Sequence, residues 1–536
     1  MPTLDWIGKK AVVGHHRQVP YHLLQADESL SVGDADCGCL LVEGDNLVAL
    51  KALLPYYAGK VKCIYIDPPF NSGEQTWTYN DHVDSPEMRG WLGRVVGREL
   101  EDLSRHDKWL CMMYPRIVLL TRFLRRDGFL FVSLDDTEIA RFRLLMEEVL
   151  PARNYVTTLV WKSRRNLDSR HKQKVSIDHE YVMVYCGGEG RLRGGAKDLG
   201  KYANPDNDPR GPWMSDNLVG LATEERRPNL HYDLVNPQTG DVYPCPRKGW
   251  RYSRETMARK IKDGRVMWPR TARGRPRHKK FLTDLQDEYT GFSTLVQCGN
   301  TNEGTEELER IMGAAPFIFP KPRSLVETLI AQTTGDGDIV LDTFAGSGTT
   351  GHAVLSLNKK DGGGRKFVLV EMDERISRSI TAPRLTRVSA GYTWTNGNRG
   401  MVGVDGLGGG FRYCRLGEPL FDEAGNIRTH VKYAELGAHV FFTETGAPLP
   451  GKVKGKGPFL GRHDGKAVFL LFNGVMGDKR PDGGNVLTGE VLRALRRFGG
   501  GEGWSVVYGE GCRLGAERLR RERVVFKQIP YEIKVT

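Results

Sequence analysis

Short apolar runs alternate with stretches of helical spacing along much of the chain. The runs are 40–42, 61–66, 129–134, 339–341 and 367–370. Their length and β-branched content are typical of buried strands in a parallel sheet. Apolar positions at helical spacing lie between them, for example Leu50, Leu53 and Leu54. The alternation predicts an α/β fold built around a parallel sheet. Period-2 alternation at 180–185 predicts one more strand.

Strand 61–66 runs directly into Asp67-Pro68-Pro69-Phe70. Neither proline can donate a ladder hydrogen bond, so the strand must stop there. We therefore expect these four residues at the carboxyl edge of the sheet, where open α/β folds bind their ligands. The polar stretch 71–89 has no periodicity and predicts a mobile loop over this edge.

A second strand, 339–341, leads into a glycine turn and the start of a helix. Gly346 and Gly348 would let the backbone approach a ligand, and Glu371, at the end of the next strand, is placed to bind ribose hydroxyls. No Gly-Lys-Ser/Thr follows the glycines, which excludes a P-loop. The spacing favours half of a nucleotide-binding sheet.

Two regions depart from this rhythm. Residues 187–315 are rich in Gly, Pro, Arg and Trp and predict an inserted, substrate-facing module. Within it, the basic run 270–280 fits either an extended arm along phosphates or an ordinary solvated loop. After about residue 415, expected strands at 467–472, 504–508 and 524–526, with a helix at 491–497, predict a small α/β module.

Composition adds limits on partners and compartment. The 536 residues carry a net charge of +12, which permits a polyanionic partner without establishing one. The nine cysteines form no CxxC pair, so we expect reduced thiols and no metal site. No signal peptide or apolar segment of membrane-spanning length is visible. We expect a cytoplasmic protein with no membrane partner.

Two motifs together resemble the paired signatures of S-adenosylmethionine-dependent DNA amino-methyltransferases. They are Asp67-Pro68-Pro69-Phe70 and Asp342-Thr343-Phe344-Ala345-Gly346-Ser347-Gly348-Thr349-Thr350. The catalytic motif comes first, the cofactor motif last and an insert between them, which is the order of the circularly permuted β class. This resemblance implies an α/β fold with a Rossmann-like sheet. Further resemblance to the modification (Mod) subunits of type III restriction systems, and to their solitary relatives, rests on Ser133 to Glu138, Asp178 to Tyr181 and Phe526 to Tyr531. It covers residues 40–390 well and the tail loosely.

The resemblance implies four segments. These are a catalytic half at 1–186, a target-recognition, DNA-binding insert at 187–315, a cofactor-binding half at 316–415 and a C-terminal α/β accessory domain at 416–536. It also implies that 338–371 supplies the first two strands of one sheet and 40–136 the next three. The two halves would then meet along adjacent strands.

S-adenosylmethionine is the cofactor that the resemblance implies. Its expected ligands are Asp342, Phe344, Ala345, Gly346, Ser347, Gly348 and Thr349 around the methionine portion, Glu371 on the ribose, Asp45 and Asn46 beside the adenine, and Lys321 and Pro322 at the methionine end. Capping and turn roles also explain the last four residues.

The catalytic motif suits methylation of an exocyclic amine. That amine is a poor nucleophile because its lone pair is delocalised into the ring. Asp67 and the carbonyl of Pro68 can accept hydrogen bonds from its N–H groups. Pro68 and Pro69 hold this carbonyl outward. Phe70 can stack on a flipped base, which is worth about 1–3 kcal/mol. Asp67 or water would take the proton after attack, and no metal is required.

The opening Asp of the motif resembles adenine enzymes, whereas cytosine-N4 enzymes more often carry Ser. We therefore predict methylation of adenine N6 in double-stranded DNA. The alternatives are a cytosine-N4 or RNA methyltransferase and a catalytically silent DNA-binding or assembly subunit. A generic nucleotide-binding enzyme would leave residues 67–70 without a role. A restriction endonuclease subunit and a second copy of the chain are further candidate partners.

Overall fold

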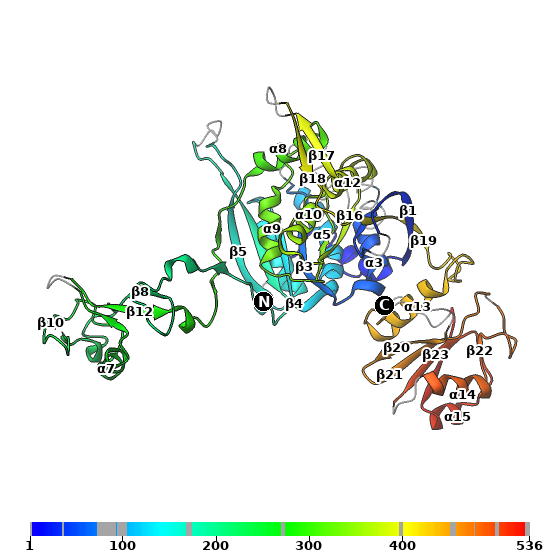
Figure 1. Cartoon of the computed structure of the whole chain (residues 1–536). Helices are drawn as coiled ribbons and strands as arrows, with labels where there is room; N and C mark the ends of the chain where they lie inside the picture. The colour runs from blue at the N-terminus through cyan, green and yellow to red at the C-terminus, as the bar shows by residue number, and fades with distance from the viewer. Residues whose placement is uncertain are drawn as a thin grey trace. The chain divides into compact units, whose positions relative to one another are not determined.

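The computed structural model describes residues 3–34, 37–71, 90, 93, 104–167, 174–269, 274–395, 400–450, 457–475, 477–498 and 503–530. It contains two compact units (Figure 1). Residues 1–192 and 293–536 form the larger unit, and residues 193–292 form the smaller one. Most of the loop predicted at 71–89 lies outside the described residues.

Five parallel strands form the centre of a ten-stranded sheet in the larger unit. In spatial order they are β2 (Leu40–Glu43), β16 (Lys366–Glu371), β15 (Ile339–Asp342), β3 (Val61–Ile66) and β4 (Leu124–Leu134). β15 pairs with β3, so the two halves of the sequence do meet along adjacent strands as expected. β2 pairs with β16, so the two cofactor-half strands separate it from β3. The reason is that helix α3 (Asn46–Tyr57) carries the chain past the two cofactor-half strands.

Five further strands widen this sheet. They are β19 (Phe411–Pro419) and β1 (His22–Val32) on one side, and β6 (His179–Cys186), β5 (Tyr155–Lys162) and β14 (Leu295–Val296) on the other. β6 confirms the strand predicted at 180–185. β1 was not predicted, because its edge position leaves most of its residues partly or fully exposed and weakens the alternation.

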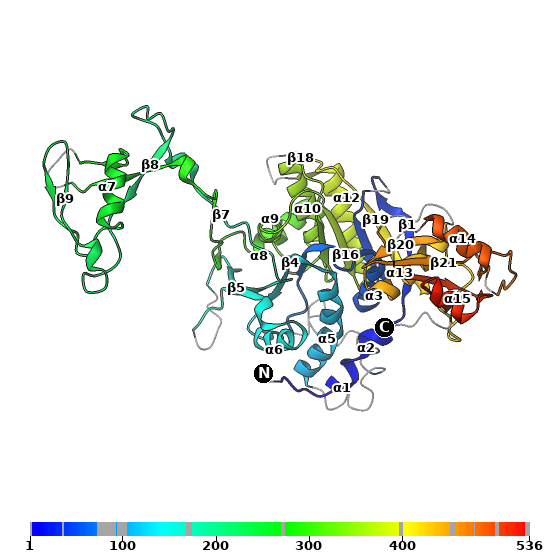
Figure 2. The same cartoon turned by 90° about the horizontal axis from the view of Figure 1, so that it is seen from below.

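Helices cover both faces of the sheet, with α5 (Arg105–Phe123) and α6 (Ile139–Val149) on one side and α9 (Arg323–Ala331) and α10 (Thr349–Asp361) on the other (Figure 2). Among the described residues, this region also contains helices α1 (Lys9–Val12), α2 (His15–Gln18), α8 (Thr301–Met312), α11 (Glu374–Ile376) and α12 (Ala382–Ala390). A hairpin of β17 (Gly391–Thr395) and β18 (Met401–Asp405) follows α12. In the described part of the chain, no helix combines the length and apolar character needed to cross a membrane.

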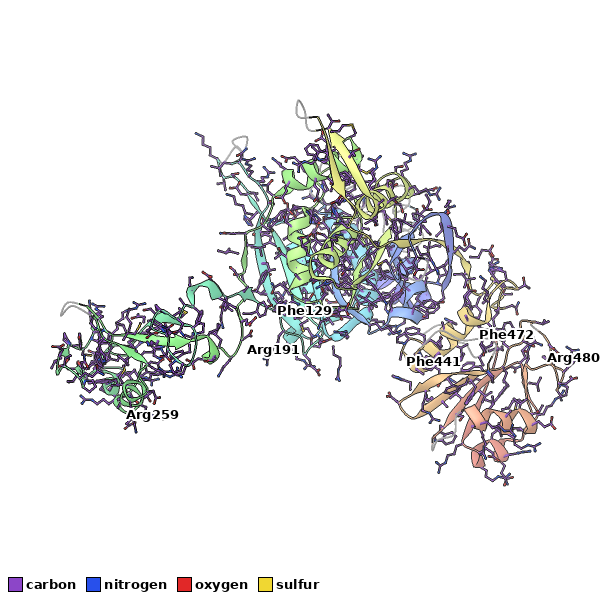
Figure 3. All side chains as sticks on the ribbon, in the orientation of Figure 1. Phe129, Arg191, Arg259, Phe441, Phe472 and Arg480 are labelled. Carbon is purple, nitrogen blue, oxygen red and sulfur yellow. The ribbon has the colours of Figure 1, made fainter. Side chains whose placement is uncertain are left out.

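The expected C-terminal α/β module is present. Its sheet has the order β20 (Phe459–His463), β21 (Lys466–Leu470), β23 (Ser505–Gly509) and β25 (Val524–Gln528). Its helices are α13 (Tyr433–Thr445), α14 (Gly489–Phe498) and α15 (Ala516–Arg521). Phe441 and Phe472, both labelled in Figure 3, are buried in an apolar core that also contains residues of the large sheet.

The smaller unit has its own core around Leu218, Tyr232 and Trp250. A three-stranded sheet of β11 (Val266–Met267), β12 (Arg277–Phe281) and β8 (Trp213–Asn217) packs with helix α7 (Arg254–Lys262). Two-stranded pairs join β7 (Gly195–Ala196) to β13 (Tyr289–Thr290) and β9 (Leu234–Val235) to β10 (Val242–Tyr243).

The described end of the basic run 270–280 is strand β12, the middle strand of this small sheet. Residues 277–280 of the run are therefore part of a folded sheet. Lys279 forms ion pairs with Asp206 and Asp208, and Arg277 donates hydrogen bonds to Ser215. Lys279 and Arg277 thus have partners within this unit, which the sequence alone did not predict. Arg270 and Arg273 lie outside the described residues.

Candidate active site

A pocket opens at the carboxyl edge of the central strands, and both sequence motifs line it. Its walls are Tyr65, Asp67, Pro68, Pro69, Phe70, Phe317, Ile318, Phe319, Pro320, Lys321, Asp342, Phe344, Ala345, Gly346, Ser347, Thr349 and Thr350. The pairing of β3 with β15 places the motifs side by side, although about 270 residues separate them in sequence. The aromatic segment 317–319 forms a wall that the sequence did not indicate.

Five expected cofactor ligands lie outside the pocket lining. They are Gly348, Glu371, Asp45, Asn46 and Pro322. Asp45 caps α3 by accepting hydrogen bonds from the Leu47 and Val48 backbone N–H groups, at 2.8 and 3.1 Å. Asn46 is buried and donates to the Thr343 carbonyl at 3.1 Å. Asn46 therefore ties the start of α3 to the residue that follows β15.

The catalytic motif is fixed on both sides of Phe70. Trp109 of α5 is completely buried and donates its indole N–H to the Pro69 carbonyl at 2.6 Å. Asn71 adopts a left-handed backbone conformation, with φ 60°, and donates to the buried Glu138 at 2.5 Å. Glu138 also contacts His106 Nδ1 at 2.6 Å. These contacts hold the backbone of the motif rigidly at the strand end.

The ammonium of Lys321 lies directly on the catalytic motif. Its Nζ is 2.9 Å from Asp67 Oδ1, 3.2 Å from Glu180 Oε2 and 4.4 Å from the centroid of the Phe70 ring. Burial opposes the charged form of this lysine, but the two carboxylates outweigh burial and raise its pKa. Lys321 was expected at the methionine end of the cofactor, and the structure brings its charge to Asp67.

A buried carboxylate holds the glycine turn in place. Glu371 accepts hydrogen bonds from the backbone N–H groups of Gly346 at 2.7 Å and Asp373 at 2.9 Å. Gly346 has φ 49°, and a Cβ at this position would approach the Phe317 ring to 3.0 Å. A side chain there would therefore be strained and would crowd the aromatic wall.

Two acids below the turn carry shifted pKa values. Burial raises the pKa of Asp342 to about 7, although hydrogen bonds from Thr350 Oγ1 and the Phe344 N–H oppose the shift. Burial likewise raises the pKa of Glu371 to about 7, against the N–H donors of Asp373 and Gly346. Desolvation disfavours each carboxylate more than its hydrogen bonds favour it.

These shifts predict a pH dependence of stability. The two carboxyls titrate near pH 4 when unfolded, so between about pH 4 and 7 the folded protein binds more protons. The stability that these two groups contribute in their protonated form is fully present below about pH 4. It is lost as the pH rises through about 7. Asp342→Asn removes one of these titrating groups. The free energy of unfolding of the wild type, minus that of the variant, should therefore fall by up to about 1.4 kcal/mol per pH unit in this window. Urea titrations from pH 5 to 8 measure it, and a flat difference would contradict the raised pKa.

Arg384 of α12 contacts the glycine turn from the interior of the protein. No sequence signal indicated a role for Arg384. Its fully buried guanidinium donates to Ser347 Oγ and Thr349 Oγ1, each at 2.9 Å. The same group lies 3.3 Å from Glu307 Oε2 of α8 and 3.3 Å from His352 Nδ1. Burial lowers the pKa of Arg384 to about 10, with Glu307 opposing that shift. One guanidinium therefore ties two pocket residues to helices α8 and α10.

The profile of the family described as DNA methylase, N6_N4_Mtase, matches residues 61–382. This span is more than half of the chain and contains both motifs of the pocket. The chain belongs to this DNA methylase family.

Similar proteins of known class are Mod subunits of type III restriction-modification enzymes. The StyLTI Mod subunit of Salmonella typhimurium is 32% identical over 66% of this chain and 57% of its own length. The EcoP15I Mod subunit of Escherichia coli is 28% identical over 69% of this chain and 64% of its own. The EcoPI Mod subunit of Escherichia phage P1 is 30% identical over 75% of this chain and 70% of its own. The matched part thus spans 57–70% of these relatives.

Proposed function

We propose that this protein transfers a methyl group from S-adenosylmethionine to the N6 amine of an adenine in double-stranded DNA. The observation that carries the proposal is the shared pocket, in which Asp67, Pro68 and Phe70 face the same space as the turn from Phe344 to Ser347. A pocket with only one of these sets would bind a cofactor or a base. A pocket with both can bring the two together.

The residues that line the pocket fit a cofactor with an amino-acid portion and positive charge. Ala345 and Gly346 line the pocket, and Phe344 and the wall at 317–319 offer apolar surface. The acidic group of Asp342 suits a ligand with ammonium and sulfonium charges. S-adenosylmethionine supplies an electrophilic methyl group when bound.

The chain's own residues orient the amine. Asp67 and the Pro68 carbonyl accept hydrogen bonds from its two N–H groups. These hydrogen bonds draw the nitrogen toward sp³ geometry and direct its lone pair. Phe70 stacks on the extruded base. Trp109 contributes by fixing the Pro69 carbonyl, so the preceding carbonyl keeps its direction. Most of the rate enhancement then comes from alignment, and Asp67 accepts the proton that the methylated amine releases.

The smaller unit, residues 193–292, is the proposed target-recognition module within the insert 187–315. Its support is position, because it is inserted between the two halves of the methylase domain. The relatives' names describe Mod subunits of restriction-modification enzymes. By analogy we propose double-stranded DNA as substrate, and a restriction endonuclease subunit and a second copy of this chain as partners.

Single-molecule sequencing of host DNA, with and without this protein, tests the proposal. We expect N6-methyladenine at one position of one short sequence only when the protein is present. Mass spectrometry of nucleosides from the same DNA gives an independent identification of the base. N4-methylcytosine without N6-methyladenine would overturn the adenine assignment, and unmodified DNA would overturn the proposed activity.

A further inference from the structure

Glu180 contacts the pocket residue Lys321 from a strand that carries neither motif. It lies near the start of β6, which runs antiparallel to β4 and pairs Tyr181 with Leu134. Because β4 is parallel to β3, the start of β6 lies at the same sheet edge as Asp67. Glu180 therefore reaches Lys321 at the edge of the site although it is distant from both motifs in sequence.

Lys321 joins this carboxylate to the catalytic one. Its Nζ is 2.9 Å from Asp67 Oδ1 and 3.2 Å from Glu180 Oε2, and the lysine is 8% exposed. The main-chain carbonyl of Lys321 accepts a hydrogen bond from Thr349 Oγ1 at 3.2 Å. One residue thus connects the catalytic strand, β6 and the first turn of the helix that follows the glycine turn.

We propose that Glu180 is a positioning residue for methyl transfer, acting on Asp67 through Lys321; this inference rests on the proposed function. Two carboxylates share one ammonium, so the cluster keeps a net charge of about −1. If Lys321 were paired with Asp67 alone, the net charge of the pair would be zero. The second carboxylate divides the ammonium between two partners and leaves Asp67 a strong acceptor for the amine, whose nitrogen becomes positive as the methyl group arrives.

The bound ammonium also restricts Asp67. Lys321 lies against Asp67 Oδ1 and above the Phe70 ring, so it fixes the orientation of the carboxylate relative to the stacking surface. Glu180 in turn restrains the ammonium, which ends a flexible side chain with three rotatable donors. Loss of Glu180 should therefore disturb the alignment of the amine more than the binding of the cofactor.

The test compares full-length variants by transfer of labelled methyl groups to duplex DNA that contains the methylated sequence. For Glu180→Gln, which keeps the shape and loses the charge, we expect kcat to fall about tenfold or more. The KM for S-adenosylmethionine should stay within about twofold. Glu180→Asp should recover part of the rate. Glu28→Gln, an exposed acid on the edge strand β1, is the matched control and should behave as wild type.

The Lys321→Met single variant and the Lys321→Met/Glu180→Gln double variant complete the cycle. If Glu180 acts through Lys321, its replacement should have little further effect once the lysine is gone. Equal kcat for wild type and Glu180→Gln, or independent effects in the double variant, would overturn the inference and leave the proposed function standing. A wild-type protein that transfers no methyl group would instead overturn the proposed function.

Discussion

Asp67→Asn should reduce methyl transfer by about 10²–10³-fold, the cost typical of removing one group that contacts the reacting centre. The amide retains the size of the carboxylate but loses its charge and one acceptor oxygen. The target amine then loses its charged acceptor, and Lys321 retains only Glu180 as a carboxylate partner. Incorporation of labelled methyl groups into DNA measures the loss.

The control for this variant is Asp482→Asn, an exposed aspartate in the C-terminal module. It should retain wild-type activity. S-adenosylmethionine binding by Asp67→Asn, measured by calorimetry, should stay near wild type because the turn at 344–347 is unchanged. Undiminished transfer by Asp67→Asn would refute the role given to this carboxylate.

Arg384→Met should lower the free energy of unfolding by about 3–5 kcal/mol, because removing one partner leaves a buried charge network unbalanced. Glu307 and His352 lose their contact with the guanidinium, and the hydroxyls of Ser347 and Thr349 lose a donor. The turn is no longer tied to α8. Chemical denaturation gives the stability change, and we also expect weaker cofactor binding.

Arg375→Met is the matched control, since Arg375 is exposed on the short helix α11. Its effect on stability should stay within about 0.5 kcal/mol. A similar small effect for Arg384→Met would show that the buried network does not stabilise the fold. A large stability loss without any change in cofactor binding would mean that the network supports the fold and not the turn.

The sequence specified the parts of this protein whose signal is local. The run 61–66 is apolar at all but one position, and the two prolines after Asp67 force a strand end there. Likewise, Gly346 and Gly348 take positive φ, which a glycine pair in a turn predicts. The sequence alone was therefore enough to place residues such as Asp67, Phe344 and Ser347 at a ligand pocket.

Tertiary structure alone decided which distant groups meet. Strand order could not be read locally, and β2 took the far side of the cofactor strands. Arg384 is an ordinary helix arginine in sequence, and its importance comes from complete burial under the turn. Lys321 and Glu180 contact each other at Asp67 because an antiparallel strand brings its start to the edge where parallel strands end. Hydrophobic spacing and turn chemistry act over a few residues, whereas these contacts depend on strand order and direction across the whole sheet.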